Sequence, residues 1–183
     1  IPGFYDDVRP AAPAILAQLE TMAPVMVPHF RKQSGVKGFW GVPEYGVLER
    51  GTAQPTLDVN GLYSGYQGPG VKTIIPAEAG FKVSCRLVAD QDPEDIGRKL
   101  KDFVLSFACP TLDIEVDLQG GSWAAELLNE GPEVKVLQRA YRATWGQEAL
   151  LAREGGSVPV LGMFHRELGM PMIQVAYGVG DNG

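Results

Sequence analysis

The segments FKVSCRL at residues 81–87, DPEDIGRKLKDFVLSF at 92–107 and LDIEVDL at 112–118 decide the fold class of this chain. In the first and third segments apolar residues alternate with polar ones, which is the period of a half-buried strand. The middle segment starts with Asp92 and Pro93, a strong signal for a helix N-terminus, and its apolar residues recur at helical spacing. The stretch therefore predicts a strand, a helix and a second strand.

A further strand is expected at residues 56–66, because apolar and polar residues alternate there as well. A turn at 67–70 separates it from the strand at 81–87. We expect one face of this antiparallel sheet to bury against the helix and the other to stay polar, which is an α+β open-faced sandwich with helices on one face. The remaining elements expected in this part are a short strand at 1–8, a helix at 11–23 that Pro24 and Pro28 end or kink, and a packed loop at 34–54.

The pattern changes after Gly120 and Gly121, and the chain then has the alternating character of an α/β piece. Residues 1–120 and 121–183 are therefore expected to belong to two domains. The elements expected in the second are a helix at 132–145, a short strand at 149–152, a helix at 160–168 and a buried strand at 172–177.

Composition excludes several classes of function. The 183 residues are 45% hydrophobic and 21% charged with a formal net charge of −6, and they contain no basic block, so nucleic acid and anionic membranes are poor partners. No apolar stretch is long enough to cross a bilayer. The two cysteines, Cys85 and Cys109, fit reduced core thiols of a cytoplasmic protein better than a single disulfide, which remains the alternative.

Metal binding by this chain alone is not expected. Its two histidines, His29 and His165, have no His or Cys at ligand spacing, and zinc requires three or four protein ligands. Neither cysteine has the setting of a nucleophile, and the glycines at 65–70 precede a strand rather than a helix, so they form a turn and not a dinucleotide-binding loop.

The candidate chemistry lies in hydrogen-bond donors. Arg86, on the polar face of a strand, offers a guanidinium for a carboxylate, or else pairs with the neighbouring acidic strand. Thr73 offers a hydroxyl at a strand–turn junction, or simply favours a strand. Gly155 and Gly156 lie at a strand-to-helix turn whose backbone N–H groups suit a carboxylate or oxyanion, and Ser157 either joins them or only caps the helix.

Several segments together resemble one enzyme family, the zinc-dependent dipeptidases and deacylases that include carnosinase, carboxypeptidase G and succinyl-diaminopimelate desuccinylase. The resemblance keeps its order over nearly the whole chain. The segments that carry it are GFYDDV at 3–8, PTLDVNG at 55–61, GYQG at 65–68, KTIIPA at 72–77, CRLV at 85–88, QDPE at 91–94 and REGGSVP at 153–159.

The resemblance implies a two-domain enzyme in which a lid, which also forms the dimer, is inserted into a catalytic α/β domain that holds two zinc ions. Residues 1–120 match most of the lid, incomplete at its N-terminal side, where its first strand and helix are missing. Residues 121–183 match the C-terminal part of the catalytic domain. Because the family's metal ligands and catalytic base have no counterparts here, the resemblance implies a fragment with no catalytic residue and no metal ligand.

The same resemblance implies roles for the candidate donors. Thr73 and Arg86 match lid residues that hold the substrate's terminal carboxylate or the oxyanion and reach the partner subunit's site. Gly155, Gly156 and Ser157 match the substrate-binding turn of the catalytic domain.

We therefore expect part of a cytoplasmic, homodimeric zinc hydrolase that cleaves dipeptides or other small amides. N-acyl amino acid deacylation is the alternative within this class, and a stand-alone dimerisation or small-ligand-binding module is the alternative outside it. An incomplete lid leaves an open sheet edge. We expect it to be stable only with a missing segment associated or with edges paired in a dimer.

Overall fold

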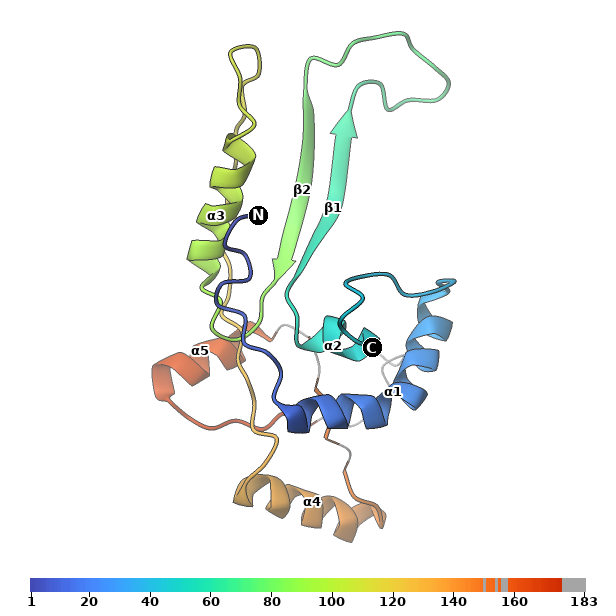
Figure 1. Ribbon diagram of the computed structural model, residues 1–183, viewed down its shortest axis with the longest axis vertical. Helices are drawn as coiled ribbons and strands as arrows, with labels where there is room; N and C mark the ends of the chain where they lie inside the picture. The colour runs from blue at the N-terminus through green and yellow to red at the C-terminus, as the bar shows by residue number, and fades with distance from the viewer. Residues whose placement is uncertain (150, 154, 156–157, 176–183) are drawn as a thin grey trace.

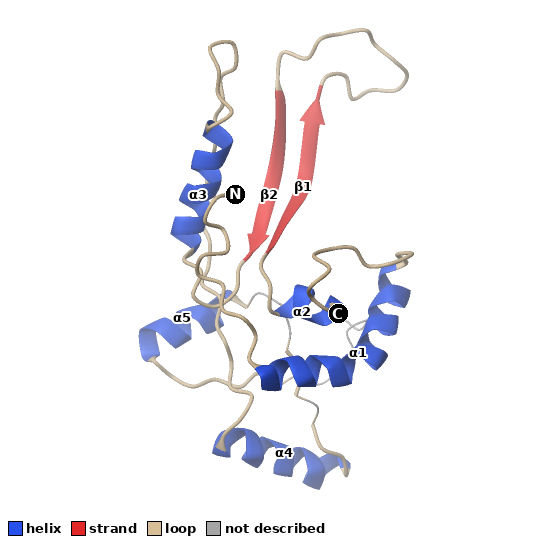
Figure 2. Cartoon of the chain, in the orientation of Figure 1, coloured by secondary structure: helices blue, strands red, loops and turns tan. Residues whose placement is uncertain are grey.

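The computed structural model describes residues 1–149, 151–153, 155 and 158–175, and the elements within them form an α+β arrangement (Figure 1). Figure 2 shows α3 standing beside a two-stranded hairpin, with the other helices gathered around the base. In chain order the elements are α1 (Pro13–Ser34), α2 (Val47–Thr52), β1 (Thr56–Ser64), β2 (Ala79–Arg86), α3 (Pro93–Leu105), α4 (Pro132–Trp145) and α5 (Pro159–Leu168).

The hairpin confirms the two strands predicted on either side of the turn region. β1 and β2 pair antiparallel from Thr56 opposite Arg86 to Ser64 opposite Ala79, with a register shift next to Asn60. The predicted α+β class with an antiparallel sheet is confirmed, but the sheet face expected to bury against the helix does not do so in this chain, where Phe81 is 53% exposed. No Cα of α3 lies within 8 Å of a Cα of β1 or β2, three elements that the structure describes completely.

Helix α3 begins as its sequence predicts. The Asp92 carboxylate accepts a hydrogen bond from the Glu94 N–H at 2.9 Å, and Pro93 occupies the first turn, where its missing N–H has no cost. Ile96 on its first turn is only 3% exposed. The helix is therefore fixed at its lower end, next to the β2–α3 connection.

The N-terminal segment packs against this connection, and the short strand expected at residues 1–8 is not formed. The segment makes turns instead and buries Phe4. Gln91, fully buried, donates from Nε2 to the Phe4 carbonyl at 2.8 Å and accepts at Oε1 from the Val88 N–H at 3.0 Å. Turns replace the strand because the Gln91 side chain, and not a neighbouring strand, satisfies this backbone.

Helix α1 is longer than expected and contains both prolines. It continues past residue 23 to Ser34, and the ribbon bends part-way along it (Figure 1). Its buried face, Ile15 and Leu19, packs on Leu48 of α2, a short helix within the segment that we expected to be a packed loop. The packing of Leu48 explains α2, since six residues are too few to form a stable helix alone.

Helices α4 and α5 confirm the two helices predicted after residue 121, but the predicted strands at 112–118, 149–152 and 172–177 are not formed in the described residues. Residues 150, 176 and 177 lie outside them. A strand forms only where a neighbouring strand takes up its backbone hydrogen bonds, and the alternation of its sequence cannot supply one. A single backbone bond, from the Leu128 N–H to the Met172 carbonyl at 3.0 Å, is made where the last strand was expected.

Both cysteines are free thiols, but the expectation that both belong to the core is wrong for Cys109, which is exposed. A hydrogen bond with the Thr111 hydroxyl lowers the pKa of the Cys109 thiol. Burial, followed by the nearby Asp58 carboxylate, raises the pKa of the half-buried Cys85 thiol. Within the described residues, no helix is long and apolar enough to cross a bilayer.

Candidate functional site

Two of the predicted site residues meet at the base of the hairpin. Arg86, the last residue of β2, donates from Nη1 to the carbonyl oxygen of Gly155 at 2.6 Å. This contact joins the end of the hairpin to the segment before α5 across 69 residues of sequence. Arg86 thus contacts a backbone carbonyl of the predicted turn.

The backbone at Gly155 approaches α2 so closely that only glycine fits. A Cβ at this position would lie 2.0 Å from the carbonyl oxygen of Gly51 and 3.3 Å from the Cα of Thr52. Gly156 and Ser157 lie outside the described residues, and the N-cap position of α5 is Val158. The described part of the predicted turn is thus held between α2 and the end of β2.

Thr73 lies in the loop at 65–78, at the opposite end of the hairpin from Arg86 (Figure 1). It is exposed. Because β2 spans seven residue steps of about 3.3 Å each, the end of this loop at Ala79 and Arg86 are separated by roughly 23 Å. The structure therefore does not bring Thr73 and Arg86 of one chain to the same small ligand.

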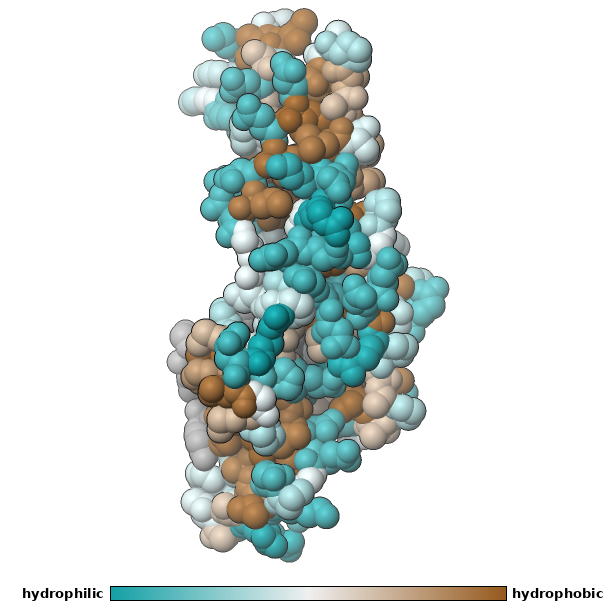
Figure 3. All heavy atoms as spheres, turned by 90° about the vertical axis from the view of Figure 1, so that its left-hand side faces the viewer, coloured by the Kyte–Doolittle hydropathy of each residue, from teal (hydrophilic) through white to brown (hydrophobic). Residues whose placement is uncertain are grey.

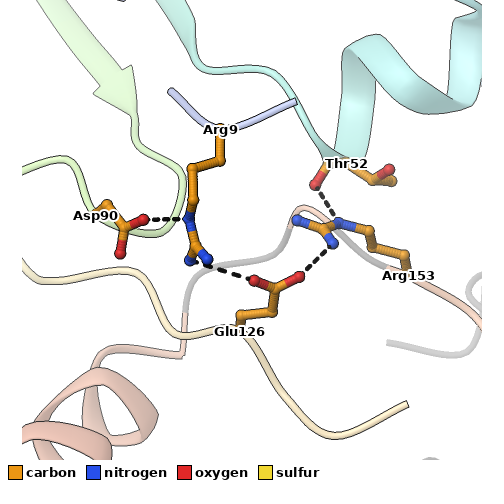
Figure 4. A network of polar contacts seen from close by, with 5 residues as sticks. All are labelled: Arg9, Thr52, Asp90, Glu126 and Arg153. Atoms are coloured by element: carbon orange, nitrogen blue, oxygen red, sulfur yellow. Dashed lines mark hydrogen bonds and ion pairs between the residues drawn. The ribbon is translucent and has the colours of Figure 1, made fainter. Parts of the chain in front are cut away.

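A polar network that sequence analysis did not identify surrounds the turn (Figure 4). Arg153 donates from Nη1 to Glu126 Oε1 at 2.9 Å and from Nε to the Thr52 carbonyl at 3.2 Å. Arg9 contacts the other oxygen, Glu126 Oε2, at 3.5 Å, and forms an ion pair with Asp90. No sequence signal could have found this network, since its members are spread from residue 9 to residue 153.

The network fixes the geometry of the candidate site. Glu126 bridges two arginines, and one of them, Arg153, lies two residues before Gly155 and is only 22% exposed at its side chain. A third contact, from the Gln18 side chain to the Leu151 carbonyl, ties the same segment to α1. Three of the contacts, Arg9 with Glu126, Arg153 with the Thr52 carbonyl and Gln18 with the Leu151 carbonyl, join residues before 91 to residues after 121, so the network connects the two predicted domains.

Arg86 and Gly155 both line a cleft of about 2810 Å³ that extends up between β2 and α3. The Arg86 guanidinium is a cationic group of this site, and a carboxylate is the ligand that a guanidinium binds best. Among the described residues there is no group of three or more His, Cys, Asp and Glu side chains that could hold a metal ion. The chemistry that Arg86 and the described part of the turn offer is hydrogen bonding and a positive charge.

Known proteins are similar to this chain in sequence and in fold. Residues 12–108, which run from the start of α1 to just beyond α3, match the family described as the peptidase dimerisation domain. The chain belongs to this family. The part that carries the peptidase dimerisation domain thus includes the hairpin, α3 and Arg86.

Two metallopeptidase relatives align with the whole of this chain. A Cys-Gly metallodipeptidase of Candida albicans is 27% identical over 192 residues, covering 100% of this chain and 38% of that protein. The human Beta-Ala-His dipeptidase is 24% identical, covering 100% of this chain and 36% of that protein. The chain therefore spans little more than a third of the length of these relatives.

A solved structure has the same fold as this chain. It is the crystal structure of an M20 family metallo-carboxypeptidase from Sulfolobus solfataricus, which superimposes with a TM-score of 0.77 at 27% identity. The match covers 92% of this chain and 38% of that one. It therefore extends well beyond residue 108, where the family match ends.

Proposed function

We propose that this chain is part of a zinc-dependent, homodimeric metallohydrolase that cleaves dipeptides, with residues 1–120 as its lid and dimerisation domain and residues 121–183 as the C-terminal part of its catalytic domain. The observation that carries the proposal is the alignment of the entire chain with two metallodipeptidase relatives, combined with the family match over 12–108. The length of those relatives supports a larger protein, because the chain spans 36–38% of them.

In this proposal Arg86 binds the terminal carboxylate of the substrate. Its guanidinium is already positioned by the Gly155 carbonyl, which leaves less conformational freedom to be lost when the substrate binds. Gly155, Gly156 and Ser157 form the substrate-binding turn, where backbone N–H groups and a hydroxyl are the donors. The Arg153–Glu126 pair holds this turn in place.

Thr73 serves the partner subunit's site in the same proposal. The length of the hairpin supports this assignment, because the loop at 65–78 lies roughly 23 Å from Arg86 of its own chain by the strand rise. A loop held that far from its own base is suited to reach another subunit. The lid would then provide dimerisation and one donor of the site together.

Zinc, when bound, supplies a Lewis acid for the scissile carbonyl and a water of lowered pKa. In this proposal the ligands and the base belong to other parts of the protein, and the described residues contain no group of three or more His, Cys, Asp and Glu side chains that could hold zinc. This chain contributes binding and orientation. The two free thiols suit a reducing compartment, and we propose that the protein is cytoplasmic.

The test uses the polypeptide as its gene encodes it, with zinc analysis and assays on Cys-Gly and β-Ala-His. We expect about two zinc ions per subunit, as in two-metal hydrolase sites, and hydrolysis of at least one of these dipeptides. Removal of the metal by a chelator should abolish hydrolysis. A protein that binds no zinc and cleaves neither dipeptides nor N-acyl amino acids would favour a stand-alone dimerisation or ligand-binding module.

Arg86→Ala tests the role of the site in that protein, and Lys82→Ala is its matched control, because Lys82 is an exposed cation on the same face of β2. Loss of a charged hydrogen bond to the substrate is expected to lower kcat/KM by about 10- to 100-fold, mainly through KM. The control should stay within about twofold. An unchanged kcat/KM in Arg86→Ala would exclude Arg86 from substrate binding.

A further inference from the structure

The segment at 151–155 belongs by sequence to the second predicted domain, but elements of the first domain hold its two ends. At one end the Gln18 side chain of α1 donates to the Leu151 carbonyl. At the other end Arg86 of β2 donates to the Gly155 carbonyl at 2.6 Å. The backbone before α5 is therefore anchored on two separate elements that precede it by more than 60 residues.

Arg153 anchors the middle of this segment to the end of α2. Its Nε donates to the carbonyl of Thr52, the last residue of that helix, at 3.2 Å. The last carbonyls of a helix have no partner within it, so a guanidinium suits this position. Two residues after Arg153, the backbone of Gly155 approaches Gly51 so closely that no side chain fits between them. Arg153 is therefore the side chain that holds the turn against α2.

Glu126 pairs with the same guanidinium and neutralises its charge. Nη1 of Arg153 donates to Glu126 Oε1 at 2.9 Å, and Figure 4 shows the guanidinium between this carboxylate and Thr52. The Arg153 side chain is only 22% exposed. A guanidinium that is already paired with a carboxylate attracts a second carboxylate less strongly. Arg153 is thus suited to holding the turn and not to binding the carboxylate of a substrate itself.

The outer members of the network lie at the surface. The side chains of Arg9 and Asp90, which form an ion pair, are 63% and 50% exposed. Figure 3, which views the molecule from the α3 side, shows hydrophilic side chains across its middle, at the height where the hairpin meets the helices of the base. Because water and salt screen exposed charges, these outer contacts fix the turn less firmly than the more buried Arg153 does.

We propose that Arg153 is a positioning residue of the carboxylate site, which consists of Arg86 and the turn that contains Gly155, and that it determines the preference of this site for a free terminal carboxylate. By fixing Gly155 on α2, Arg153 sets the separation between the turn and the Arg86 guanidinium before a ligand binds. A site whose donors are already ordered binds a carboxylate more tightly than one whose donors must first be ordered. Glu126 contributes through Arg153, because it holds the guanidinium in place.

The inference rests on the proposed function in taking Arg86 and the turn as the site of the terminal carboxylate, and its test measures binding without turnover. The protein is the polypeptide as its gene encodes it, supplied with zinc. The ligands are two Ala-Ala analogues in which CH₂–NH replaces the scissile amide, one with a terminal carboxylate and one with a terminal carboxamide. Calorimetry gives both dissociation constants. The carboxylate analogue should bind about 10- to 100-fold more tightly, because only it forms a charged hydrogen bond with Arg86.

Arg153→Ala should reduce this preference by about tenfold, because the turn is no longer fixed relative to Arg86. Arg139→Ala removes an exposed arginine of α4 and is the matched control, whose preference should stay within about twofold of the wild type. A substitution that only loosened the protein would weaken the binding of both analogues equally and leave the preference unchanged. An unchanged preference in Arg153→Ala would therefore overturn the proposal.

Glu126→Gln is a milder variant that decides the question if Arg153→Ala does not fold. It keeps the size of the side chain and removes the charge that holds the Arg153 guanidinium, so the preference should fall by about two- to fivefold. Glu130→Gln, an exposed position in the same segment, should leave the preference unchanged. Equal preferences in these two variants would overturn the role given to Glu126 and, without a folded Arg153→Ala protein, the whole proposal.

The double variant Arg86→Ala, Arg153→Ala shows whether Arg153 acts through the carboxylate site or binds the ligand directly. Arg86→Ala alone should remove most of the preference, so the second substitution should lower it by no more than about twofold further. A further tenfold fall would mean that Arg153 binds the carboxylate itself and would overturn its role as a positioning residue.

Failure of this inference and failure of the proposed function give different results. A wild-type protein that prefers the carboxylate analogue but cleaves no dipeptide would refute the proposed function, and the Arg153 variant would still decide this inference. A dipeptidase whose preference is unchanged in Arg153→Ala would refute this inference and leave the proposed function intact. A wild-type protein that binds neither analogue has no carboxylate site, and this inference would be overturned.

Discussion

The β2–α3 connection before α3 and residues 113–118 after it lie on either side of the same helix in sequence, yet their backbone groups are satisfied very differently. At the base, Gln91 is fully buried and its side chain bonds the Phe4 carbonyl and the Val88 N–H. Residues 113–118, by contrast, make no backbone hydrogen bond to another described residue. The difference shows that a backbone segment is fully buried only where its N–H and C=O groups have hydrogen-bond partners. A side chain can supply them to a turn, whereas a strand requires a neighbouring strand.

The largest expected effect tests the base. Gln91→Leu keeps the side-chain volume but leaves two buried backbone groups without partners, and we expect the free energy of unfolding to fall by about 2 to 4 kcal/mol. Denaturant unfolding measures it, with Gln147→Leu at an exposed position as the control. Equal stability of the two variants would mean that the base is no better anchored than the surface.

The helix cap is expected to have a smaller effect. Asp92→Ala removes the acceptor of the Glu94 N–H and should cost about 1 kcal/mol of stability. Asp102→Ala, later in the same helix, is the control and should change stability by less than about 0.5 kcal/mol. A loss as large as that of Gln91→Leu would show that α3 is held by its cap more than by the buried base.

The network at the candidate site is expected to contribute less, because its charges are partly exposed. Glu126→Gln weakens the ion pairs with Arg9 and Arg153, and we expect a loss of about 0.5 to 1 kcal/mol that shrinks at high salt. Glu130→Gln, an exposed position in the same segment, provides the comparison. A salt-independent loss would indicate that packing and not charge joins the two regions.

The smallest effect concerns the pH dependence of α3. The hydrogen bond from Lys99, with the charges of Lys99 and Arg98, lowers the pKa of Asp95, so the folded state binds a proton less readily there than the unfolded chain. This contribution is present above the unfolded value of about 3.9 and is lost as pH falls through the lower folded pKa. Asp95→Asn should therefore reduce the fall in the free energy of unfolding between pH 7 and pH 2. Asp102→Asn should leave that fall as large as in the wild type. An equal fall in the two variants would contradict the role assigned to Asp95.

Much of the fold follows from local signals in the sequence. Asp92 and Pro93 predict the start of α3, and the helical spacing of apolar residues continues along the helix. β1 and β2 follow from alternation on either side of a turn. At the site, the sequence predicts Arg86 as a hydrogen-bond donor. In the structure its guanidinium donates to the Gly155 carbonyl. No local signal indicated that Arg153 and Glu126 would support this turn, because their contact depends on segments distant in sequence.

The sequence by itself therefore determined α3, α4, α5, the first half of α1, the hairpin and the choice of candidate donors, since caps, periodicity and turns act over a few residues. Only the tertiary structure decided whether residues 1–8 and 112–118, which both have strand character, become strands. At 1–8 the buried Gln91 satisfies the backbone of a turn, and at 113–118 no described segment pairs with the backbone. A helix bonds within itself, whereas a strand is completed by its neighbour, and the pattern of one segment does not specify what lies beside it.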